Sequence, residues 1–215
     1  MNQAELELFL LNQVPLRTRA LIPSTFKAAY AAAAGLMAET PMLSVPSAED
    51  NYGRFISWAV DFGFQKLIES GQWPCDYRWR PFARPTGRYL EIRLTHSIIT
   101  ISQVSDPEKQ PRDVVFRANM RLHNEPYLDL EEFAYENQVL GLPHILLVHG
   151  HHTLDFIHLG IPYGRHSAGY LYRTPNLLNM PHDMTAPQAQ EENTDIEAVM
   201  SLREEIERWQ RENGQ

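Results

Sequence analysis

Apolar and polar residues follow two different periods along this chain, and the change comes near residue 72. Before it, three segments carry apolar residues three and four positions apart, which is the spacing of one helix face. These segments are 4–13, 25–39 and 51–70. After it, polar and apolar residues alternate singly, as in strands that are covered on one face. The pattern therefore predicts helices first and an antiparallel sheet after them.

The segment 51–70 has the clearest helix pattern. Its apolar face carries Ile56, Ala59, Val60, Phe64 and Leu67. Ser47 or Asp50 can cap the start of this helix, and Gly71 can end it. The alanine-rich run within 25–39 combines high helix propensity with small side chains, so we expect it to pack closely against a neighbour in the core.

Several segments after residue 72 are predicted to be strands, because they are rich in β-branched and aromatic residues. They are 77–82, 88–94, 97–104, 113–122, 145–149, 153–161 and 169–174, with a short helix at 128–138. Within 88–94, Leu90 and Ile92 share one face while Glu91 and Arg93 share the other. We therefore expect a sheet that is covered on one side and solvated on the other.

The last part of the chain is predicted to be a tether followed by a helix. Residues 174–193 contain several prolines and little periodicity, which is typical of an extended connector. Thr194 and Glu197 have the spacing of a capping box at the start of a helix over 194–215. The apolar stripe of that helix consists of Val199, Leu202, Ile206 and Trp209.

Together these patterns predict an α+β fold with one domain at 1–173. Its N-terminal helices, within 1–72, would pack on a central antiparallel sheet within 73–173. A C-terminal amphipathic helix would follow on the Pro-rich connector.

The chain has 215 residues, a single cysteine and a net charge of −8. Its start lacks the pattern of a secretory leader, and no run approaches the roughly 18 apolar residues that a membrane span needs. One cysteine excludes an internal disulfide framework and is compatible with a reducing compartment. We therefore expect a cytoplasmic protein with no membrane partner. The negative charge, concentrated after residue 100, leaves nucleic acid open as a partner but does not favour it.

Histidines gather at positions 149, 151, 152 and 158. If Gly150 and His151 form a two-residue turn, His149 lies opposite His152. Opposed Cβ atoms lie about 4.5–5.5 Å apart, close enough for two imidazoles to share one metal ion. A longer loop would misalign them. His158 lies on the order of 20 Å along the strand from His152, too far to join that site.

This cluster has two interpretations. In one, His149 and His152 hold a divalent ion, zinc or manganese, which activates water in a small hydrolase or nuclease. The third ligand would come from His151, His166 or His182. In the other, the histidines are exposed turn residues and hydrogen-bonded strand residues, and there is no cofactor. We adopt the second interpretation, because tighter metal motifs such as HExxH are absent, and keep the metal hydrolase as the alternative.

Arginine and aromatic residues alternate over 73–93. On a strand, Arg78 and Arg80 fall on one face while Tyr77 and Trp79 fall on the other. Base stacking and phosphate contact would then come from different surfaces, which argues against a platform for single-stranded nucleic acid. Two uses are left for the arginines Arg78, Arg80, Arg84 and Arg88. They can pair with the acidic half of the chain, or they can bind an acidic or phosphate-bearing partner.

Other catalytic patterns are incomplete. Asp76 followed by Glu91, Ile92 and Arg93 has the order of a restriction-type nuclease site, but arginine does not give up its proton to act as a base. A cross-strand ion pair explains these residues better. Cys75 has no identifiable base, and the motifs GxSxG, GxGxxG and GxxxxGK[ST] are absent.

The C-terminal stripe is too short to define a coiled coil, and it can bury against its own domain, another subunit or a partner. We expect a binding protein that recognises a protein, or an acidic or phosphate-bearing partner, with a homo-oligomer as one form of that contact. Arg78, Arg80, Arg84 and Arg88 would contact the partner together with Val199, Leu202, Ile206 and Trp209. No catalytic residue is assigned, because no complete set of acid, base or metal ligands is present.

Overall fold

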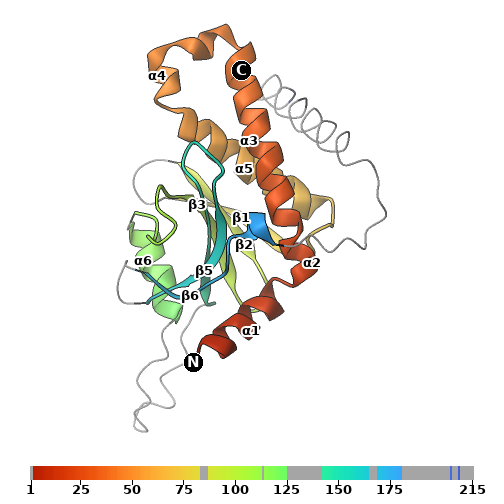
Figure 1. The fold of residues 1–215 in the computed structure, drawn as a ribbon, viewed down its shortest axis with the longest axis vertical. Helices are drawn as coiled ribbons and strands as arrows, with labels where there is room; N and C mark the ends of the chain where they lie inside the picture. Colours follow the sequence, from red (N-terminus) through yellow and green to blue (C-terminus); the bar gives the residue numbers. More distant parts are fainter. Residues whose placement is uncertain are drawn as a thin grey trace.

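The computed structural model of this protein describes residues 2–82, 87–112, 114–124, 142–164 and 169–180, together with Glu204 and Arg208. The predicted α+β class is confirmed: helices near the N-terminus pack on a six-stranded, mostly antiparallel sheet (Figure 1). The predicted helix at 128–138 lies outside the described residues, as do most of the connector and of the C-terminal helix.

The N-terminal helices are α1 (Gln3–Gln13), α2 (Leu16–Arg19), α3 (Leu21–Glu39), α4 (Pro46–Glu49) and α5 (Tyr52–Glu69), with a 3-10 turn η1 at Pro41–Ser44. The three predicted N-terminal helices are present as α1, α3 and α5, with α3 beginning four residues earlier than predicted, and short elements that were not predicted lie between them. The alanine-rich helix α3 packs closely against α5, as expected from its small side chains. At Gly63 of α5, an added Cβ would lie only 3.2 Å from the methyl group of Thr25 on α3.

The two ends of α5 test the predicted caps. Gly71 follows the helix with φ of 76°, the left-handed conformation that commonly ends a helix, so this prediction is confirmed. The predicted N-terminal caps are wrong. Asn51, rather than Ser47 or Asp50, is the N-cap residue, and its side chain makes no capping hydrogen bond.

The six strands are β1 (Asp76–Pro81), β2 (Arg88–Arg93), β3 (Ile98–Gln103), β4 (His144–His149), β5 (Ile157–Pro162) and β6 (Tyr170–Arg173). They lie in the sheet in chain order, with β1 at one edge and β6 at the other. Neighbours are antiparallel except β3 and β4, which are parallel. The predicted antiparallel sheet therefore contains one parallel pair at its centre.

The connection between β3 and β4 corrects a second prediction. Residues 113–122, which alternate like a strand, contain instead the helix α6 (Val115–Arg121), followed by a 3-10 turn η2 (Leu122–Asn124). Parallel neighbours need a crossover, which usually contains a helix. In the helix, the ring of Phe116 stacks on Tyr89 of β2, with ring centroids 4.2 Å apart.

The sheet has a core on both faces at its centre, not on one. On the side of α3 and α5, Ile92, Ile99 and Leu147 pack with Phe26 and Phe64. On the side of α6, a smaller cluster contains Val104, Leu146, Val148 and Phe156, with Tyr170 packed against it. All six residues of β4 are buried, because both of its faces are covered. Among the described helices, none has the length and apolar character needed to cross a membrane.

Candidate functional site

Arg78 and Arg80 project from the same face of β1, as predicted, and both residues are exposed. The aromatic residues of β1 face the other way, toward α5. The hydroxyl group of Tyr77 donates a hydrogen bond to Oε1 of Glu69 at 2.6 Å. Trp79 shares that side of the strand, so the arginines are left on a surface of their own.

Glu91 of β2 lies opposite Arg78 in the strand register and is only 2 % exposed. Its Oε2 lies 3.3 Å from Nε of Arg80, and its Oε1 lies 3.4 Å from Nη1 of Arg93. A cross-strand ion pair is therefore present at Glu91, but its partner on β1 is Arg80, which the sequence did not single out for this pair, and the carboxylate is buried rather than solvated. Arg78, Arg80 and Arg93 share this face of the sheet, and we call them the arginine face.

The strand register changes the membership of the predicted arginine surface. Arg88 is exposed, but it lies opposite Pro81, and strand alternation places it on the side of Leu90 and Ile92. It therefore does not share a surface with Arg78 and Arg80. Arg93 takes its place on the arginine face. Arg84 lies outside the described residues.

A row of buried polar side chains continues from Glu91 across the sheet. Thr100 of β3 lies opposite Glu91, and its hydroxyl group is 2.8 Å from Nε2 of His144 on β4. Burial lowers the pKa of His144 to about 3, with help from the positive charge of Arg117. The Nδ1 atom of His144 has no hydrogen-bond partner among the described residues. His144 is therefore neutral near pH 7.

The helix α6 covers part of this row. Nη2 of Arg117 donates to the hydroxyl oxygen of Ser102 at 2.9 Å, and Nη1 donates to the carbonyl oxygen of Arg112 at 2.8 Å. Nε of Arg121 donates to the carbonyl oxygen of Gly164. Guanidinium groups from β1, β2 and α6 therefore line this side of the sheet.

The predicted two-residue turn in the histidine segment is wrong. β4 ends at His149, β5 begins at Ile157, and these two residues lie opposite each other in the register. Residues 150–156 form a longer loop, and His149 and His152 are not cross-strand partners. Gly150 is required there, because an added Cβ would collide with the carbonyl oxygen of Thr153. Close packing of the loop on itself therefore replaces the tight turn.

His149 points into the core and its hydrogen bonds fix its tautomer. The hydroxyl group of Tyr30 donates to the carbonyl oxygen of Gly150 at 2.6 Å and lies 2.8 Å from Nδ1 of His149. Because the single hydroxyl proton goes to the carbonyl oxygen, Nδ1 of His149 must carry a proton and donate it to Tyr30. Burial lowers the pKa of His149 to about 3, so the ring is neutral near pH 7.

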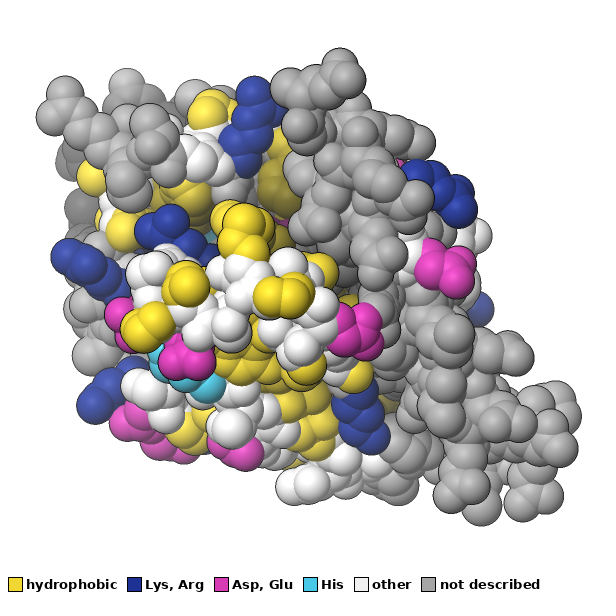
Figure 2. Space-filling view, turned by 90° about the horizontal axis from the view of Figure 1, so that it is seen from above, with side chains coloured by type: hydrophobic (Ala, Val, Ile, Leu, Met, Phe, Trp, Pro, Cys, Tyr) yellow, Lys and Arg dark blue, Asp and Glu magenta, His cyan; other side chains and the backbone are white. Residues whose placement is uncertain are grey.

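The next two histidines lie at the surface. His152 has φ of 66°, and its ring contacts Tyr52 of α5 with centroids 5.7 Å apart. The ring of His151 lies against that of His152, tilted by 33°, with centroids 4.0 Å apart. Figure 2 shows histidine side chains reaching the surface at the end of the molecule where α4 and α5 lie.

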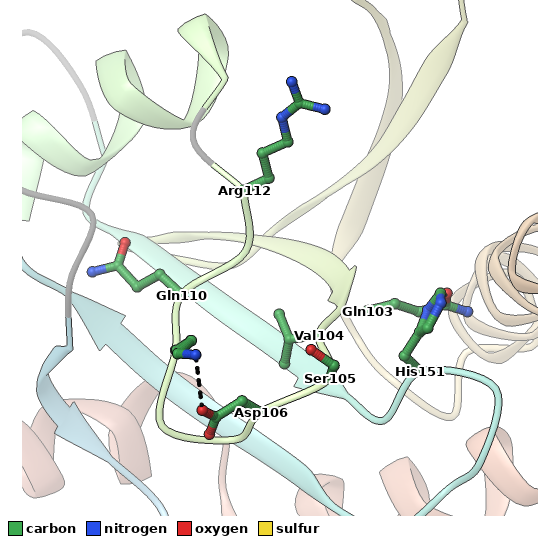
Figure 3. A pocket seen from close by; sticks show the side chains of 8 residues that line it. Gln103, Val104, Ser105, Asp106, Gln110, Arg112 and His151 are labelled. Carbon is green, nitrogen blue, oxygen red and sulfur yellow. Dashed lines mark hydrogen bonds and ion pairs between the residues drawn. The ribbon is translucent and has the colours of Figure 1, made fainter.

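His151 borders a polar pocket of about 300 Å³ at the carboxyl ends of the parallel strands β3 and β4. The amide nitrogen of Gln103 donates to the carbonyl oxygen of Gly53, so its Oε1 accepts from Nδ1 of His151 at 3.2 Å. Gln103 and His151 lie together at one end of the pocket, away from Gln110 (Figure 3). Loops that diverge beyond parallel strands commonly form ligand crevices, and Nε2 of His151 offers an acceptor there.

These positions do not assemble a metal site from the described residues. No group of three or more His, Cys, Asp or Glu side chains in the described part of the chain is placed to hold a metal ion. His166 and His182, two of the proposed third ligands, lie outside that part, so the metal hypothesis for His149 and His152 stays a prediction. Burial, followed by the charge of Asp76, raises the pKa of the Cys75 thiol to about 12, which makes it a poor nucleophile.

Two features of this region escape sequence patterns. Glu91 alternates like a solvated residue, but α6 packs on its side of the sheet through Phe116 and Tyr89, and Arg80 and Arg93 flank the carboxylate. His144 is separated by two and four residues from Leu146 and Val148, so strand alternation puts all three side chains on the same face. This spacing could have identified His144 as a buried residue.

Comparison with known proteins gives no match to a protein-family model, a curated protein or a solved structure.

Proposed function

We propose that this protein is a binding protein, and that its arginine face recognises an acidic or phosphate-bearing group on a partner protein. The observation that carries this proposal is the arrangement around Glu91. The carboxylate is buried beneath the face, while the Arg78 side chain and half of the Arg80 side chain reach solvent. The positive charge is therefore presented outward on a fixed strand.

The chemistry of arginine supports this assignment. A guanidinium group stays charged and offers paired N–H donors that match a carboxylate or a phosphate. Arg78 forms no ion pair with another described residue, and Arg80 is held in place by Glu91 without being covered. Rigid positioning of this kind reduces the entropy lost on binding.

The position of β1 supports a protein partner. β1 is an edge strand of the described sheet, and an extended segment of another protein can pair along such an edge. A long nucleic acid is disfavoured by the net charge of −8 and by the packing of Tyr77 against α5 rather than outward. A chain with a single cysteine does not depend on internal disulfides, so it is compatible with the reducing cytoplasm, where we place the partner.

Calorimetric titration of the full chain tests the proposal, with sodium tripolyphosphate and an oligoglutamate peptide as probes. We expect saturable binding of at least one probe at low ionic strength. The affinity should fall as salt is added, because exposed charges are screened. Failure of both probes to bind at low salt, or binding that is indifferent to salt, would rule out the arginine face as the recognition surface.

A further inference from the structure

An apolar groove of about 570 Å³ runs between α3 and α5, on the opposite side of the sheet from the arginine face. The surface that α3 contributes to the groove has small side chains at Ala32 and Ala33, and Leu36 lies on the same face of the helix. Its wall on α5 is aromatic, with Phe55, Trp58 and Phe62 at spacings of three and four residues, and Trp79 of β1 also lines it.

Large apolar side chains are exposed in this groove. The Trp58 residue is 62 % exposed and Trp79 is 37 % exposed. A contiguous apolar surface with large aromatic side chains marks a contact site rather than a solvated face. The groove between two packed helices has the shape that a third helix fills.

The same chain carries a segment with a matching pattern. The stripe Val199, Leu202, Ile206 and Trp209 repeats at three and four residues, as one face of a helix does. Glu204 and Arg208 are helical and exposed in the structure. In a helix of 3.6 residues per turn, Glu204 falls roughly opposite the middle of the stripe, and Arg208 falls on the same outer side. The two exposed residues therefore lie on the polar side of the helix, away from the stripe.

The tether is long enough for this contact within one molecule. The 3-10 turn η4 (Leu177–Asn179) packs beside α3, and Leu177 is buried in the core. The connector from Met180 to Thr194 can extend to about 45–50 Å, whereas α3, with 19 residues, is about 28 Å long. A covalent tether of this reach gives the segment a high effective concentration at the groove.

We propose that residues 194–215 dock as a helix in the groove between α3 and α5 of their own chain, with the stripe facing Ala32, Leu36 and Trp58. This contact is independent of the arginine face. It assigns the stripe an intramolecular role, in place of the expected contact with a partner.

Thiol labelling of the full chain tests the proposal. In a Cys75→Ser background, Leu36→Cys places the only thiol in the groove, and Ala38→Cys places it on the exposed side of the same helix. We expect the Leu36→Cys thiol to react with a maleimide on the order of tenfold more slowly than the Ala38→Cys thiol, because the groove must open first. Adding Leu202→Asp and Ile206→Asp, or Trp209→Asp, should abolish this protection. The matched change Glu204→Ala should leave it intact.

Three results would overturn the proposal. The first is equally fast labelling at both positions in the otherwise unchanged chain. The second is protection that survives both sets of stripe substitutions. The third is protection that increases with protein concentration, since this would show that the groove is filled by a second copy. These outcomes are separate from the binding of tripolyphosphate, which the stripe variants should not alter.

Discussion

Nε of Arg80 lies 3.3 Å from Oε2 of Glu91, and the two side chains differ in exposure, at 50 % for Arg80 and 3 % for Glu91. The ion pair therefore joins a buried carboxylate to a guanidinium group that still reaches solvent. Such a pair holds the arginine in one direction without hiding it. The carboxylate of Glu91 thus stabilises the fold and at the same time offsets part of the positive charge that a partner would bind.

Glu91→Gln should lower the stability of the domain and raise its affinity for tripolyphosphate. The loss of stability should be about 1–3 kcal/mol, because Arg80 and Arg93 lose a charged acceptor at a buried position. The affinity should rise severalfold, because one competing negative charge leaves the arginine face while the glutamine amide oxygen can still accept a hydrogen bond from Arg80 and hold it in place. Urea denaturation and calorimetry measure the two effects. Glu49→Gln, on the exposed surface of α4, is the control and should change neither. A variant that loses both stability and affinity would contradict the account.

The burial of His149 predicts a pH dependence of stability. Its pKa is lowered from 6.5 to about 3 in the folded state. The unfolded chain therefore takes up a proton first as the pH falls, and stability is lost between pH 6.5 and pH 3. The wild type should lose up to about 1.4 kcal/mol per pH unit relative to His149→Gln in this window. All other groups are common to both proteins, so the difference isolates His149.

Urea denaturation near pH 7 and near pH 5 measures this difference. His96→Gln, which replaces an exposed histidine, serves as the control and should follow the wild type. If the curves of the wild type and His149→Gln stay parallel from neutral to acid pH, the burial of a neutral His149 is disproved.

Substitution of glycine by alanine should have opposite effects on stability at Gly150, in the loop after β4, and at Gly35, in the helix α3. At Gly150, an added Cβ would collide with the carbonyl oxygen of Thr153, and neither backbone can yield without moving the loop. Gly150→Ala should therefore cost about 1–3 kcal/mol. At Gly35 of α3, an added Cβ meets nothing within 4 Å. Gly35→Ala should stabilise the domain by about 0.5–1 kcal/mol, because alanine favours the helix. Thermal unfolding compares the two, and a tolerated Gly150→Ala would refute the observed loop.

Much of this fold could be predicted where one periodic signal dominated. The apolar spacing of α5 and the glycine at position 71 marked a helix and its end. The alternation of β1 separated Arg78 from Tyr77 correctly. In each case the local sequence and the tertiary environment require the same conformation, so a reading of the chain alone is sufficient.

The remaining features depend on contacts distant in sequence. Residues 113–122 alternate like a strand, but the parallel pairing of β3 and β4 requires a crossover, and α6 forms there. The alternation in β2 predicts an exposed Glu91, but α6 packs on the same side of the sheet. The turn at Gly150 depends on where β5 begins, and the register places Ile157 opposite His149. The pairing of β3 with β4 and the register of β4 with β5 cannot be deduced from the periodicity of apolar residues along the chain.

The most direct test of the arginine face compares two charge reversals on neighbouring strands. Arg78→Glu and Arg88→Glu change the net charge equally, and both residues are exposed, but they lie on opposite faces of the sheet. Calorimetric titration with tripolyphosphate should show binding abolished, or weakened at least about tenfold, by Arg78→Glu and little affected by Arg88→Glu. If the two variants lose the same affinity, or if Arg78→Glu binds like the wild type, the arginine face is not the binding site.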